Sequence, residues 1–108
     1  MVGKNQHGES WAKSLNSLVI KYFKDNLSSY DFINETVHGP NWGVRYAKDD
    51  VEIHIGGDIG FGINIIIDGK EYPLWQYDRS VNNAMDTHER NILYQLNVLK
   101  RFLSERPW

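Results

Sequence analysis

The chain has 108 residues, a hydrophobic fraction of 41% and a formal net charge of −2, which are typical of one globular domain and exclude a disordered chain. It contains no cysteine, which excludes disulfides, thiol catalysis and cysteine-ligated metals. No apolar run approaches the roughly 20 residues that span a bilayer. We therefore expect residues 1–108 to form a single domain that does not bind a membrane.

Residues 10–26 are predicted to form an amphipathic helix. Apolar residues recur at spacings of three and four, which places them on one stripe: Trp11, Leu15, Leu18, Val19, Tyr22 and Phe23. Ser10 is the expected N-cap, because its hydroxyl can accept from a first-turn amide. The opposite side is expected to be polar, with Lys13, Asn16, Ser17, Lys21 and Lys24.

Three short strands are expected next, over residues 30–37, 42–47 and 51–55. The third alternates most cleanly, with Val51, Ile53 and Ile55 inward and Glu52 and His54 outward. Turn residues separate the three strands at 38–41 and 48–50. Such short connections indicate an antiparallel meander, since a parallel crossover would need a dozen or more residues.

Residues 59–77 are predicted to form a hairpin around Asp68-Gly69, a sequence typical of a type I′ turn. Counting outward from this two-residue loop pairs Ile65 with Tyr72 and Gly62 with Trp75. The second arm, residues 70–77, is expected to be an edge strand because Pro73 cannot donate to a ladder.

Residues 78–85 are polar and irregular, and a second amphipathic helix is expected over 87–104. Asp86 and Glu89 are typical of a capping box, and Pro107 would end the helix. The predicted fold is therefore α+β, with an antiparallel sheet of about five strands flanked by an N-terminal and a C-terminal helix. Both helices are expected on the one apolar face, which leaves the other face partly open.

The residues offer few catalytic or metal-binding patterns. The histidines lie in separate segments without the spacing of a zinc site, so no metal or cofactor is expected. Glu52 and His54 share a strand face and could perform acid–base chemistry if Arg45 supplied a cation. The glycine-rich segment 56–62 leads into a strand rather than a helix, so we expect a bulge or close turn there, not a phosphate loop.

The charge distribution favours a basic protein partner. Residues 27–78 carry nine acids against three bases, whereas the segments on either side are each net positive. An acidic segment argues against nucleic acid as a direct partner. Aromatic side chains beside acids are also typical of protein-binding surfaces. The expected partner-binding residues are Asp49, Asp50, Glu52, His54, Asp58, Glu71 and Trp75.

The segment YPLWQYDRSVNNAMDTHERNILYQLNVLKRFL, residues 72–103, resembles the C-terminal part of small bacterial immunity proteins of contact-dependent inhibition and other polymorphic toxin systems. The shared features are a terminal strand with Leu74-Trp75-Gln76-Tyr77-Asp78, a polar connector and a closing amphipathic helix. The resemblance implies a cytoplasmic, non-catalytic protein that blocks one cognate toxin domain, often a nuclease with a basic cleft. It transfers no functional residue by position.

Two other interpretations stay open. One is a small metal-independent hydrolase or nuclease that uses Glu52 and His54. The other is a homo-oligomeric ligand-binding module formed through the open sheet face or the edge near Pro73.

Overall fold

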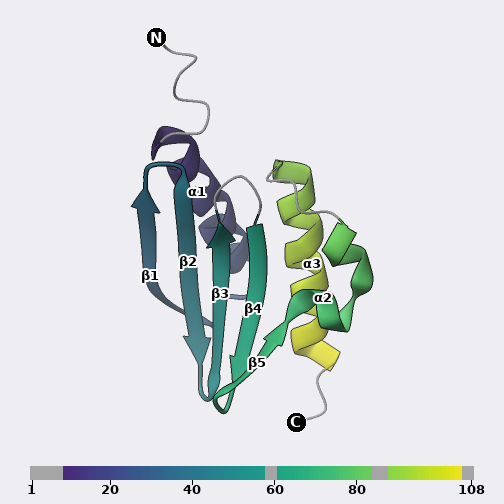
Figure 1. Cartoon of the computed structure of the whole chain (residues 1–108). Coiled ribbons are helices and arrows are strands. Elements are labelled where there is room, and N and C mark those ends of the chain that lie inside the picture. The colour runs from purple at the N-terminus through teal and green to yellow at the C-terminus, as the bar shows by residue number, and fades with distance from the viewer. Residues whose placement is uncertain (1–8, 58–60, 84–87, 106–108) are drawn as a thin grey trace.

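The computed structural model describes residues 9–57, 61–83 and 88–105. Helix α1 (Glu9–Asn26) precedes an antiparallel sheet whose five strands follow sequence order: β1 (Asp31–His38), β2 (Asn41–Lys48), β3 (Val51–Gly57), β4 (Phe61–Ile67) and β5 (Lys70–Pro73). The chain continues through helix α2 (Leu74–Tyr77) and 3₁₀ helix η2 (Arg79–Asn83) to helix α3 (Glu89–Glu105) (Figure 1). The predicted α+β class and five-stranded antiparallel sheet are confirmed.

Helix α1 buries the apolar stripe that its periodicity predicts, but two sequence-based assignments on it are wrong. The helix already includes Glu9, so Ser10 lies inside it and is not the cap. Asn16 was expected on the polar side, yet it is fully buried. Its side-chain amide donates to Glu35 Oε1 at 3.2 Å and to the Thr36 carbonyl at 3.1 Å, which ties α1 to β1.

The central strands alternate between a buried and an open face as predicted. Val51, Ile53 and Ile55 of β3 are buried, and the odd-numbered residues of β4 pair beside them. The turns use the residues expected, since Asp49, Asp68, Gly39 and Gly69 all have positive φ. Strands β2, β3 and β4 therefore present one continuous apolar surface.

The second arm of the hairpin is shorter than the sequence indicates. Ile65 does pair with Tyr72 and Asn64 with Pro73, but β5 ends there. Pro73, with φ −62° and ψ 138°, turns the chain into α2, whose Leu74 is buried. Trp75 consequently lies on α2 and does not cover Gly62, so that predicted pair is wrong.

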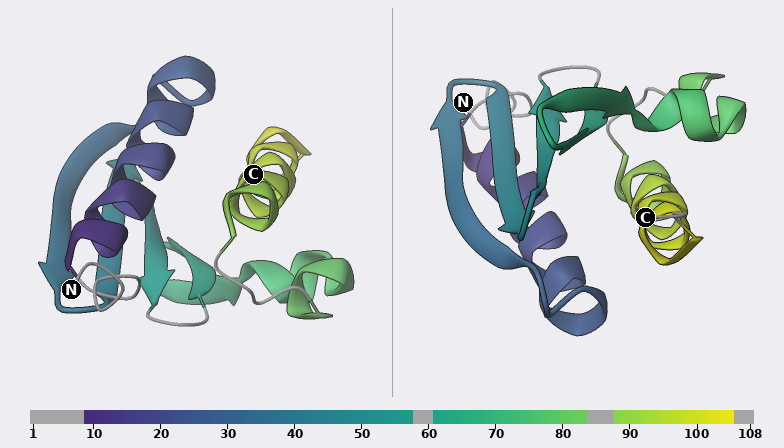
Figure 2. Two further views of the ribbon diagram at one scale, coloured as in Figure 1. Left: turned by 90° about the horizontal axis from the view of Figure 1, so that it is seen from above. Right: turned by 90° about the horizontal axis from the view of Figure 1, so that it is seen from below.

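Helices α1 and α3 cover the same face of the sheet, as predicted (Figure 2). Helix α3 packs on α1 and α2, and its Ile92, Leu96 and Leu99 are buried in the core that it shares with α1 and the sheet. The predicted cap Asp86 and the predicted stop Pro107 lie outside the described residues. Among the helices of the described ranges, none is long and apolar enough to cross a membrane.

Candidate functional site: the open face of the sheet

The alternation of side chains along each strand shows which residues lie on the sheet face that no helix of the described ranges covers. Because side chains alternate along a strand, the residues between the buried positions of β2, β3 and β4 point away from both helices. The register places them in rows that cross the strands. One row runs through Asn34, Arg45, His54 and Asn64, and the next row toward the strand ends runs through Thr36, Gly43, Gly56 and Gly62.

Arg45, Glu52 and His54 form a contacting trio on this face. Glu52 Oε1 lies 3.0 Å from His54 Nε2 and 3.6 Å from Arg45 Nη2, and Arg45 Nε lies 3.3 Å from the same His54 nitrogen. One ring nitrogen cannot donate to Glu52 and accept from Arg45 at once. Glu52 and Arg45 therefore compete for His54 Nε2.

The charge state of the trio follows from these contacts. The hydrogen bond from His54 holds the pKa of Glu52 below its ordinary value, and the charges of His54 and Arg45 add to this effect. Glu52 is therefore ionised at neutral pH. All three side chains reach solvent, which screens their interactions.

Acidic residues gather at one end of the open face. Asp49 and Asp50 form the β2–β3 turn, and Asp68 stands in the β4–β5 turn. The two turns adjoin, because the backbone amide of Asp68 donates to the carbonyl of Asp50 at 3.1 Å. Glu71 extends this group on β5, opposite Ile66 on the open side.

The lysines near this acidic end lie on the helix side of the sheet. Lys48 is two residues after buried Tyr46 on β2 and therefore points to the same side of the sheet. Its Nζ contacts the Ser29 hydroxyl and the Tyr30 ring. Lys70 pairs with Ile67, another inward position. Among the described lysines and arginines of the five strands, only Arg45 has the parity of the open face, where it already pairs with Glu52.

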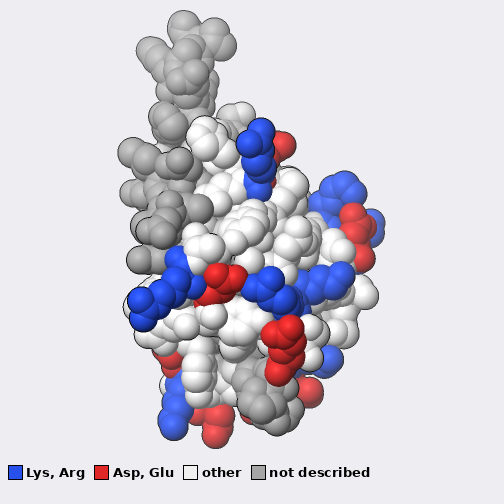
Figure 3. All heavy atoms as spheres, turned by 90° about the vertical axis from the view of Figure 1, so that its right-hand side faces the viewer, with Lys and Arg blue, Asp and Glu red and all other residues white. Residues whose placement is uncertain are grey.

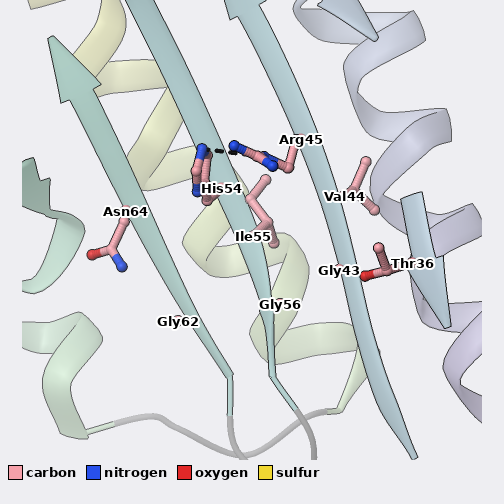
Figure 4. A pocket seen from close by; sticks show the side chains of 9 residues that line it. All are labelled: Thr36, Gly43, Val44, Arg45, His54, Ile55, Gly56, Gly62 and Asn64. Atoms are coloured by element: carbon pink, nitrogen blue, oxygen red, sulfur yellow. Dashed lines mark hydrogen bonds between the residues drawn. The ribbon is translucent and has the colours of Figure 1, made fainter. Parts of the chain in front are cut away.

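A hollow lies beside the trio, with glycines along its floor (Figure 4). Its volume is about 640 Å³, and its polar lining side chains are Thr36, Arg45, His54 and Asn64. Figure 4 shows Arg45 and His54 pointing toward one another at one side of the glycine row. We call this hollow the furrow.

The structure brings together only part of the predicted binding set. Glu52, His54 and Glu71 share the open face, and Asp49 and Asp50 lie at its acidic end. Asp58 lies outside the described residues. Trp75 is half-exposed on α2. On the side of the molecule that lies to the right in Figure 1, basic and acidic side chains are intermixed (Figure 3).

The furrow is a feature that local sequence patterns do not predict. Counting from the β2–β3 turn would have paired Gly43 with Gly56, but Gly62 joins the row only through the β3–β4 register. That register is not set by a two-residue loop, so the sequence carried no simple signal for it.

Within the described ranges, no three histidine, aspartate or glutamate side chains group so as to hold a metal ion. Comparisons with models of protein families, with curated proteins and with solved structures found no match.

Proposed function

We propose that this chain is an immunity-type binding protein that neutralises a cognate bacterial toxin domain, such as a nuclease, by covering its basic active-site surface. The observation that carries the proposal is the acidic end of an uncovered sheet face. Asp49, Asp50 and Glu71 lie there, while the nearby Lys48 and Lys70 belong to the helix side. Because acids and lysines are separated in this way, this end of the uncovered face carries a local negative charge that a basic partner can recognise.

Such an arrangement acts mainly on the rate and specificity of association. Opposite charges on two proteins steer their encounter and disfavour partners of the wrong sign, and salt weakens this effect. Apolar area near the acids, at half-buried Ile66, can add contact surface beside the charges. A partner on this face would need no rearrangement of the helices, which pack on the other side.

The test begins with capture of partners from the source organism's lysate at low and moderate salt, identified by mass spectrometry. The expected result is one basic partner, released as salt rises and encoded beside this chain. With the purified partner, the double variant Asp50→Lys/Glu71→Lys should raise Kd at least about tenfold, mostly through slower association.

The matched control reverses a charge on α1. Asp25→Lys also adds positive charge, at an exposed site whose ion-pair partner is Lys21. It should leave Kd nearly unchanged. Equal losses for the control and the double variant, or no loss for either, would contradict binding through the acidic end.

A second candidate function is hydrolysis of a phosphodiester by Glu52 and His54. It is favoured by the 3.0 Å contact between Glu52 Oε1 and His54 Nε2 and by the nearby Arg45 guanidinium. Purified protein incubated with RNA, DNA and nucleotides should then release product, and Glu52→Gln and His54→Ala should each abolish the release. Absence of hydrolysis with and without added metal rules this function out.

A further inference from the structure

Three glycines meet in one row across the open face, close to the end of β3 and the beginning of β4. Gly43 pairs with Gly56, and Gly56 pairs with Gly62. Glycine weakens a strand, because it loses more backbone freedom on folding and offers no side chain to pack. A row of glycines across neighbouring strands therefore requires a reason.

Close packing of the backbone explains the glycines at only some positions of this row. A Cβ at Gly56 would stand 2.4 Å from the Trp42 carbonyl oxygen, so the backbone excludes any side chain there. A Cβ at Gly43 would lie 3.1 Å from Thr36 Oγ1, a tight contact. At Gly62 a Cβ would meet nothing within 4 Å, and φ is not positive. Packing thus leaves Gly62 unexplained.

The side chains around the glycine floor define the chemistry of the furrow. Among the described residues that line it, none is acidic, although the chain carries 14 acids. Arg45 and His54 line one side, and Thr36 and Asn64 add a hydroxyl and an amide. The volume of about 640 Å³ lies within the roughly 300–1,000 Å³ of ligand pockets.

The Arg45 guanidinium has hydrogen-bonding capacity to spare. Its Nη2 stands 3.6 Å from Glu52 Oε1, an ion-pair distance that is too long for a good hydrogen bond. Its Nε meets a His54 nitrogen for which Glu52 competes. A planar guanidinium can bind an incoming carboxylate through two parallel hydrogen bonds.

We propose that the furrow binds a small planar aromatic carboxylate, with its ring against the bare backbone of Gly43, Gly56 and Gly62 and its carboxylate on Arg45. The lack of side chains at these positions lets a flat ring approach the peptide planes. Asn64 and Thr36 lie at the margins to bind polar substituents. This site does not depend on the proposed toxin partner, so either proposal can fail while the other holds.

The test is an NMR titration of the ¹⁵N-labelled chain with indole-3-carboxylate and, separately, with benzoate. Saturable shifts are expected for the backbone amides of Gly43, His54, Gly56 and Gly62 at millimolar concentrations or below. Indole, which lacks the carboxylate, should bind at least about tenfold more weakly. Absence of saturable shifts with both carboxylates overturns the proposal, as does equal binding of indole.

Variants locate the site. Gly62→Val places a branched side chain on the floor, where a Cβ has space. It should weaken binding of indole-3-carboxylate at least about tenfold while leaving the melting temperature equal or higher, since valine favours strands. Arg45→Gln should weaken binding by a similar factor.

The matched control is Ala47→Val, which adds a similar side chain to the same sheet face outside the furrow. It should leave the affinity for indole-3-carboxylate unchanged. If Gly62→Val binds as tightly as the unmodified chain, or if Ala47→Val weakens binding equally, the carboxylate does not occupy the furrow.

Discussion

Asn16 is a fully buried polar side chain that joins α1 to the edge of the sheet. Its amide donates both to Glu35 Oε1 and to the Thr36 carbonyl. Asn16→Ala should lower the free energy of unfolding by about 1–3 kcal/mol, because two acceptors lose a donor in a partly buried place. Urea unfolding measures this, with exposed Ser17→Ala on the same helix as the control. If Asn16→Ala lowers the free energy of unfolding no more than Ser17→Ala does, these hydrogen bonds make no net contribution to stability.

Asn16→Asp gives a sharper result at the same position. Aspartate has the shape of asparagine but places a second carboxyl group beside Glu35. In the unmodified chain, Glu35 Oε1 lies 3.2 Å from the amide nitrogen of Asn16. Like charges at this distance disfavour ionisation, so the new carboxyl should have a raised pKa. The folded variant is most stable while the new carboxyl is protonated, and it loses stability as pH rises through the pKa of this carboxyl in the folded chain. Urea unfolding should therefore show the variant losing stability, relative to the unmodified chain, from acidic toward neutral pH.

Glu52 provides a pH prediction of the opposite sign. Its pKa is lowered in the folded chain, first by the hydrogen bond from His54 and then by the nearby charges. Stability from these contacts is present above the pKa of the unfolded chain and is lost as pH falls through the folded pKa. Carboxyl ¹³C NMR should show the pKa of Glu52 rising more in His54→Ala than in Arg45→Gln. A larger rise in Arg45→Gln would show that Arg45, not His54, is the main partner.

At the scale of elements, a polar network holds α2 and η2 against α3. Arg101 Nη2 donates to Asp78 Oδ2 at 2.6 Å, and Arg101 Nε donates to the Tyr77 hydroxyl at 3.2 Å. The Tyr77 hydroxyl in turn donates to Glu105 Oε1 at 2.5 Å. A helix as short as α2 is not stable alone, so its position depends on these contacts and on buried Leu74.

Arg101→Met should release α2 while leaving the sheet intact. Amide hydrogen exchange over residues 74–83 is expected to become faster, whereas exchange in β3 and β4 stays unchanged. Lys100→Met on the same helix is the control, since Lys100 contacts Asn26 of α1 rather than α2. Faster exchange across the whole chain would mean that Arg101 supports the global fold and not this element alone.

The same elements show what the sequence could and could not predict. Strand alternation and the Asp68-Gly69 turn correctly placed β2, β3 and β4 and the first hairpin pairs, because both signals are local. The sequence does not predict where β5 ends, because residues 74–77 are compatible with a strand as well as with a helix. The contact of Tyr77 with Arg101 of α3, which favours the helix, is not visible in the local sequence. Buried Asn16 was missed for the same reason, since its acceptors lie on β1. Contacts between distant segments decided each of these cases.

At the scale of the whole molecule, the sheet has one buried face and one open face. Helices α1 and α3 lie on one side of the sheet (Figure 2). By strand alternation, the trio and the glycine row of the furrow lie on the other side. One-sided antiparallel sheets are stable with such a solvated face, and the core requires only the inward residues. The outward residues are therefore available for binding, at the acidic end and in the furrow, without cost to the core.

This division predicts unequal effects at two neighbouring isoleucines of β4. Ile65 is fully buried toward the helices, whereas Ile66 is half-buried on the open face between Glu52 and Glu71. Ile65→Ala should lower the free energy of unfolding by about 2–5 kcal/mol, and Ile66→Ala by less than about 1 kcal/mol. Urea unfolding at two protein concentrations measures both. If Ile66→Ala costs as much as Ile65→Ala and the loss depends on concentration, a second copy covers the open face, and both binding proposals would have to compete with self-association.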